Sequence, residues 1–229
     1  MNKLWVFGDS QTEGYDASLY YSKTPLPNWR KKYIDWKGYI PSVFNTILAD
    51  KLKIETINCG IGGADNYTIF HTIIKNLEKI NKDDIVIIGW SSIGRFRLAN
   101  RNNEVLEPIQ TWMLRLKDDE LSKLGIDISQ QTVSEIFANR TNSIYVSEIN
   151  DYIKVLKLLL KEKKIINWSP FYDNFKMGMH ITPIALLDTI IDETKYEVLD
   201  GHFCEPSHFA LADYFYDLII RYNNKKTLL

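Results

Sequence analysis

Four short runs, each nearly continuous in apolar character, divide the sequence and constrain its fold more than any other feature. They are bounded by Gly, Ser or Asp, and none is long enough to suit a buried helix. Such runs are typical of strands that are buried on both faces of a parallel sheet. The runs are Lys3–Phe7, Ile54–Cys59, Ile85–Ile88 and Lys164–Trp168.

Helical patterns lie between and after these runs. Apolar residues with helical spacing cover Tyr39–Leu52, Tyr67–Ile80, Ile149–Leu160 and a closing stretch from His208 to Tyr222. Parallel strands require right-handed crossovers, and the crossover helices cover both faces of the sheet. The sequence therefore predicts the α/β class: a three-layer α/β/α sandwich with a mainly parallel, flavodoxin-like central sheet of about five strands.

We expect a single domain over residues 1–229, because no linker-like stretch divides the chain. Two segments interrupt the alternation of strand and helix. Residues 15–39 interleave tyrosines and tryptophans with lysines and an arginine, and we interpret them as a substrate loop or, equally, as a loop packed over the core by its aromatics. Residues 98–148 are polar and are expected to form a helical insertion.

Charge and composition exclude several classes of protein. The formal net charge is -1 and is not concentrated in blocks, which argues against a nucleic-acid partner. No stretch approaches the roughly 20 apolar residues of a membrane span. The run after Met1 is too short for a secretion signal, and the two cysteines fit a reducing compartment, so a cytoplasmic location is expected. The oligomeric state is left open.

A serine follows the first predicted strand, in Gly8-Asp9-Ser10. A side chain at this point stands at the carboxyl edge of the sheet, where ligands of such folds bind. A second glycine-rich segment, Asn58–Gly63, follows the next predicted strand and would present backbone N–H groups to an oxyanion or a phosphate. It is not a dinucleotide fingerprint, because Asp65 stands where the third glycine is needed.

A histidine with a nearby carboxylate precedes the closing helix, in Asp200-Gly201-His202. Such a pair suits a general base and the group that orients it. His71 and His208 are interpreted as structural residues, and His180 lies in an irregular stretch. No metal-binding motif is present, and neither a metal nor another cofactor is expected.

Taken together, these segments resemble the SGNH (GDSL-like) hydrolase superfamily over nearly the whole chain. The matching blocks are Gly8–Gln11, Asn58–Gly63 and Asp200–His208. The resemblance implies an esterase with Ser10 as the nucleophile and with Asp200 and His202 completing a catalytic triad. It also implies an oxyanion hole that uses the backbone N–H groups of Ser10 and Gly63.

Two departures from the family pattern concern the site. The third block normally reads Gly-x-Asn-Asp, whereas Gly89-Trp90-Ser91-Ser92 stands here, so that Ser91 takes the place of an oxyanion donor. Ser91, Ser92 or Arg95 would have to replace the missing carboxamide. In addition, Asp200 precedes His202 by two residues instead of three, which leaves Glu205 or a backbone carbonyl as alternatives for orienting the ring.

Other nucleophiles fit the residues less well. Ser91 lies in a near match to Gly-x-Ser-x-Gly, but Ile93 occupies the second glycine position. Cys204 lies two residues after His202 and is interpreted as a small buried residue instead of a thiol nucleophile.

The predicted substrate is an O-acyl ester, with acetyl as the favoured acyl group, on a small molecule, a saccharide or a glycoconjugate. Aromatic rings can stack on sugars, so Trp29 and Trp36 are assigned to substrate binding together with Asp9, Trp90 and Arg95. Two alternatives remain open: an O-acyltransferase that uses the same Ser10, and a non-catalytic carbohydrate-binding protein on a degenerate SGNH fold.

Overall fold

The structure, a computed structural model, describes residues 2–13, 42–92, 95, 116–123, 128–139, 142–161, 163–169 and 205–226. Side chains at 142–145, 205–206 and 222–226 are not described. In chain order the elements are β1 (Lys3–Gly8), α1 (Ser10–Glu13), α3 (Phe44–Leu52), β2 (Glu55–Gly60), α4 (Asn66–Asn76), the 3-10 turn η1 (Leu77–Lys79), β3 (Ile85–Gly89), α5 (Asp118–Lys123), α6 (Gln130–Asn139), α7 (Asn142–Leu159), β4 (Lys164–Trp168) and α9 (Glu205–Lys226).

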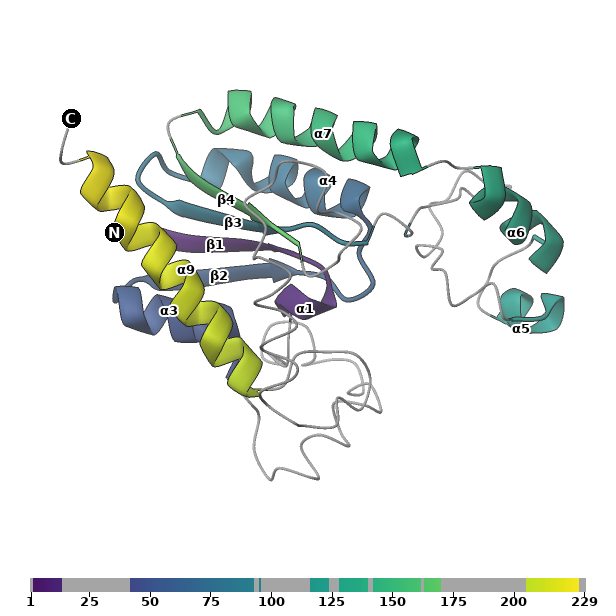
Figure 1. Ribbon diagram of the computed structural model, residues 1–229, viewed down its shortest axis with the longest axis horizontal. Helices are drawn as coiled ribbons and strands as arrows, with labels where there is room; N and C mark the ends of the chain where they lie inside the picture. Colours follow the sequence, from purple (N-terminus) through teal and green to yellow (C-terminus); the bar gives the residue numbers. More distant parts are fainter. Residues whose placement is uncertain are drawn as a thin grey trace.

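The strands form one parallel sheet in the order β2-β1-β3-β4 (Figure 1). Each of the four apolar runs predicted as a strand is a strand, within one residue at either end. The fifth strand of the expected five has no counterpart in the described residues. The register aligns Gly8 with Gly60 and Gly89 with Trp168, so the strands end together at one edge of the sheet.

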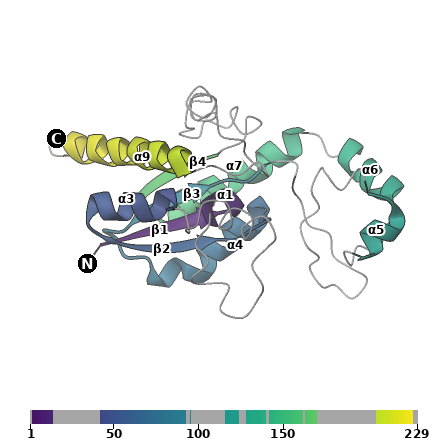
Figure 2. The ribbon, with the colours of Figure 1, turned by 90° about the horizontal axis from the view of Figure 1, so that it is seen from below.

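Alternate residues of the central strands contribute their side chains to two separate hydrophobic cores. Leu4 and Val6 of β1 pack with α3 and α9, whereas Trp5 and Phe7 pack on the opposite face with α4 and α7. Figure 2 shows α3 and α9 on one side of the sheet and α4 on the other. Because both faces are covered, β3 and all of β1 after Lys3 are apolar and buried, and the predicted three-layer α/β/α sandwich is confirmed.

Local signals determine where the helices begin and end. The carboxylate of Asp65 accepts the Thr68 N–H at 2.9 Å and caps the start of α4. α3 ends where Lys53 adopts a left-handed conformation with φ 55°. α7 begins at Asn142, seven residues before the predicted start, and α5 and α6 account for part of the expected helical insertion. Figure 1 shows α5 and α6 beyond the start of α7, away from the sheet.

Glycines at the strand ends allow α1 to lie directly on the sheet edge. An added Cβ at Gly8 would stand 2.0 Å from Thr12 Oγ1, and one at Gly60 would stand 2.4 Å from the backbone nitrogen of Glu13. Neither distance is compatible with normal packing. The position of α1, and of Ser10 at its start, therefore depends on the absence of side chains beneath it.

We predict that Gly60→Ala destabilises the protein by about 1–3 kcal/mol, because its Cβ would push against the α1 backbone. Chemical denaturation monitored by circular dichroism measures this change. Gly62→Ala is the matched control, since its Cβ would approach only the end of the Glu13 side chain, Oε2, at 2.8 Å. Equal stabilities of the two variants would contradict the packing argument.

Candidate active site

Ser10 begins α1 at the carboxyl edge of the sheet. Its side chain is half-buried, whereas those of Asp9, Gln11 and Thr12 are buried. Asp9 caps the turn: its Oδ1 accepts the Gln11 N–H at 3.0 Å, and its backbone oxygen accepts the N–H groups of Thr12 at 3.0 Å and Glu13 at 2.8 Å. The Ser10 side chain is thus the partly exposed member of a tightly bonded turn.

A second turn lies beside the first. The Ala64 N–H donates to the Ile61 oxygen at 3.0 Å, and Gly63 within this turn has φ 75°, a conformation that favours glycine. The Ile61 N–H donates to the Gly8 oxygen at 3.0 Å, which joins this turn to the end of β1. Among the described residues, neither the Ser10 N–H nor the Gly63 N–H has a hydrogen-bond acceptor.

A buried ionic network lies behind the Ser10 turn. Asp9 Oδ2 accepts hydrogen bonds from Ser91 Oγ at 3.0 Å and from Arg95 Nη1 at 2.9 Å, and Arg95 Nη1 also contacts Ser91 Oγ at 2.9 Å. The Asp9 side chain is 2% exposed and that of Arg95 16% exposed. A carboxylate this deeply buried is stable only when it is paired, and here both of its oxygens are.

Ser91 does not take the part that the sequence assigns to it. Its side chain is fully buried, and its hydroxyl donates to Asp9. The expectation of an oxyanion contact from Ser91 is therefore not met, and the same burial disfavours Ser91 as a nucleophile. The Ser92 carbonyl accepts the Arg95 N–H at 3.2 Å.

The burial of Asp9 and Trp90 does not favour the substrate contacts expected of them, and the contact expected of Arg95 stays a prediction. Trp90 is fully buried, and its Nε1 donates to Asn167 Oδ1 at 3.0 Å. The Asp9 carboxylate faces the interior, and an Arg95 nitrogen is bound to it. Sequence reasoning places these residues correctly at the sheet edge, but their side chains turn inward.

Two asparagines that the sequence does not single out support the site. Asn66 bonds reciprocally with the backbone of Ser91, accepting its N–H at 2.7 Å and donating to its oxygen at 3.0 Å. Asn58 Nδ2 donates to the backbone oxygens of Thr12 at 3.3 Å and Glu13 at 3.2 Å, at the end of α1. No sequence spacing indicates these roles, because each bond joins segments that are distant in the chain.

Four predicted site residues lie outside the described residues: Asp200, His202, Trp29 and Trp36. Cys204, interpreted as a small buried residue, lies outside them as well. The side chain of Glu205, the first residue of α9, is likewise not described.

Two of the remaining histidines are described. His208 is 1% exposed and stacks on Phe44, with ring centroids 6.2 Å apart, as expected of a structural residue. His71 lies exposed on α4 and stacks on Tyr67 at 5.7 Å.

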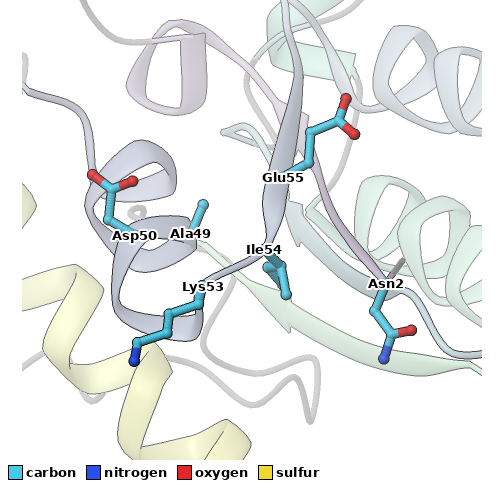
Figure 3. A pocket seen from close by; sticks show the side chains of 6 residues that line it. All are labelled: Asn2, Ala49, Asp50, Lys53, Ile54 and Glu55. Atoms are coloured by element: carbon cyan, nitrogen blue, oxygen red, sulfur yellow. The ribbon is translucent and has the colours of Figure 1, made fainter.

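A pocket lies at the opposite, amino edge of the sheet (Figure 3). It is lined by Asn2, Ala49, Asp50, Lys53, Ile54 and Glu55. Asn2 precedes β1, and Glu55 begins β2, so this pocket is separated from Ser10 by the length of the strands. Ligands of parallel α/β sheets bind at the carboxyl edge, and we do not assign this pocket to the chemistry of Ser10.

In the part of the chain that the structure describes, no three His, Cys, Asp or Glu side chains gather in a way that suits a metal ion. None of the helices there combines the length and the apolar character needed to cross a membrane.

Comparisons with known proteins concern the fold. No family model matches the chain, and no curated protein matches it. Among solved structures, the chain is similar to a lipolytic protein of the G-D-S-L family from Desulfitobacterium hafniense, with 11% identity and a TM-score of 0.46 over 95% of this chain and 99% of that chain. It is also similar to a GDSL-like lipase from Parabacteroides merdae, with 14% identity and a TM-score of 0.47 over 93% of this chain and 92% of that one.

A third similar structure is an acetylxylan esterase from Geobacillus stearothermophilus, with 14% identity and a TM-score of 0.46 over 93% of this chain and 92% of that one. Because one fold hosts many activities, we argue the function from the residues of this chain.

The thiol of Cys59, on β2, does not compete as a nucleophile near neutral pH. Burial raises its pKa from 9.0 to about 11, against a smaller opposite effect of Lys79. At pH 8 about one thiol in 10³ is ionised in the folded chain, against about one in ten with the ordinary pKa.

We therefore predict that iodoacetamide alkylates Cys59 about 10²-fold more slowly in the folded protein than in the unfolded chain at pH 8. In the folded protein the rate should rise with pH up to about pH 11, because only the thiolate reacts. Peptide mapping by mass spectrometry measures the rate at Cys59 separately from that at Cys204. A plateau already near pH 9 would contradict the raised pKa.

Proposed function

We propose that this protein is a serine esterase that cleaves an O-acyl ester, with Ser10 as the nucleophile and His202 as its base. The observation that carries the proposal is the Ser10 turn: a partly exposed serine at the carboxyl edge of a parallel sheet, on a backbone fixed by the buried Asp9 cap. A nucleophilic serine needs this combination of exposure and rigidity.

The oxyanion hole that we propose consists of the backbone N–H groups of Ser10 and Gly63. Neither has a hydrogen-bond acceptor among the described residues, and both lie at the same edge of the sheet. N–H groups held in fixed turns stabilise a developing negative charge without having to reorganise during the reaction. Ser91 is left out of this proposal, because its hydroxyl donates to Asp9.

The reaction would proceed in two halves. Ser10 Oγ attacks the ester carbonyl while the His202 imidazole takes its proton, and the imidazolium then protonates the departing alcohol. The acyl group is left on Ser10. Water, deprotonated by His202, attacks this acyl-enzyme, and the imidazolium returns the proton to Ser10 Oγ as the acid leaves. Asp200 would hold the imidazole in the required tautomer.

We predict that a fluorophosphonate inactivates the protein and that mass spectrometry locates the added phosphonyl group on Ser10. Ser10→Ala and His202→Ala should each lower p-nitrophenyl acetate turnover by about 10³-fold or more, and the double variant no further, because the pair acts as a unit. Ser122→Ala, on the exposed face of α5, is the control and should keep full activity.

Two outcomes would contradict this assignment. Equal turnover in the wild type and Ser10→Ala, without labelling, would favour a carbohydrate-binding protein without catalysis. Near-normal activity of His202→Ala would show that another group acts as the base.

For the substrate, we propose an acetyl ester of a saccharide, on the basis of the aromatic and basic composition of residues 15–39. We predict that Trp29→Ala or Trp36→Ala raises KM for an acetylated oligosaccharide about tenfold, through loss of stacking on the sugar. KM for p-nitrophenyl acetate, which carries no sugar, should stay unchanged in the same variants. A parallel rise for both substrates would indicate a general defect and contradict a sugar platform.

A further inference from the structure

We propose that Arg95 is a positioning residue that holds the two oxyanion turns in register, and that it acts through Asp9 and Ala64 without touching the substrate. This inference rests on the proposed function of Ser10. It follows from the contacts of one guanidinium nitrogen with three segments of the chain.

The first contact fixes the nucleophile turn. Arg95 Nη1 lies 2.9 Å from Asp9 Oδ2, and the other oxygen of the same carboxylate accepts the Gln11 N–H at 3.0 Å. Ser10 stands between these two residues in the chain. The bond from Arg95 therefore holds in place the carboxylate that bends the backbone around Ser10.

The second contact reaches the other turn. The same Nη1 lies 3.4 Å from the backbone oxygen of Ala64, the residue that follows Gly63. The two proposed oxyanion donors, Ser10 and Gly63, are thus each next in sequence to a residue that Arg95 binds. Movement of the guanidinium would change the separation of the two N–H groups.

The third contact anchors Arg95 itself. Nη1 lies 2.9 Å from Ser91 Oγ, and Ser91 is held through its backbone by both ends of the Asn66 carboxamide. A hydroxyl fits this place because it donates to Asp9 while accepting from Arg95. A carboxamide at position 91 would have to fit into the same fully buried space.

Arg95→Met tests this role, because it removes the charge and keeps most of the side-chain volume. We expect kcat for p-nitrophenyl acetate to fall about 10²-fold while KM changes by less than about threefold, since a shift of about 1 Å in a reacting group is sufficient for such a loss. Arg95→Lys should recover about a tenth of the wild-type rate through one charged bond to Asp9. Lys154→Met, which removes an exposed ion pair with Asp151, is the control.

Hydrogen exchange of the Gln11 amide gives a readout that does not depend on catalysis. We expect it to exchange at least about tenfold faster in Arg95→Met than in the wild type, at a temperature where both are folded. If Arg95→Met does not fold, Ser91→Ala takes its place, because it keeps the charge of Arg95 and removes one hydrogen-bond donor to Asp9. We then expect a smaller fall in kcat and a smaller rise in the exchange rate of the Gln11 amide.

The outcomes separate the two proposals. A folded Arg95→Met with wild-type kcat and wild-type Gln11 exchange would overturn the positioning role and leave a stabilising ion pair. A raised KM at unchanged kcat would overturn it in favour of direct substrate binding. If the wild type shows no turnover that depends on Ser10, the proposed function fails, and Gln11 exchange still decides whether Arg95 fixes the turn.

Discussion

A buried carboxylate needs hydrogen-bond donors in place of the water that it has lost. At the carboxyl edge of this sheet, the buried carboxylate is that of Asp9. Its donors come from three places: the backbone of its own turn, Ser91 after β3, and Arg95 a few residues beyond. Satisfying one buried charge therefore connects segments that are more than 80 residues apart in the chain. The rigidity of the edge follows from this requirement.

The layered fold could be predicted because its signal is local. Val6 and Ile87 lie in strands covered on both faces, so their runs contain no polar interruption, and the runs mark the strands to within a residue. The start of α7 was harder to place. Its first turns, from Asn142, carry Ser143, Ser147 and Glu148 among their apolar residues. The apolar spacing is clearest from Ile149 to Leu156, although Val146 packs on the same core.

The site could be predicted only in part, because sequence indicates where a residue lies along the chain but not where its side chain points. Ser10 lies at the expected edge with a partly exposed side chain, whereas Ser91 and Trp90 lie at the same edge and turn inward. One sequence signal did indicate the direction of the Asp9 side chain. An aspartate before a short helix is typical of an N-cap, whose carboxylate accepts a backbone N–H. The bond between Asn66 and Ser91 gave no such signal.

The close packing of α1 on Gly8 and Gly60 limits which parts of the sequence can change without moving Ser10. The turn that carries Ser10 is held against the sheet by this packing, and residues 15–39, for which a role in substrate binding is proposed, follow it in the sequence. Under the proposed function, changes in residues 15–39 would alter what is recognised while Ser10 keeps its place. Selectivity and reactivity would then be encoded in adjacent but separable stretches of the gene.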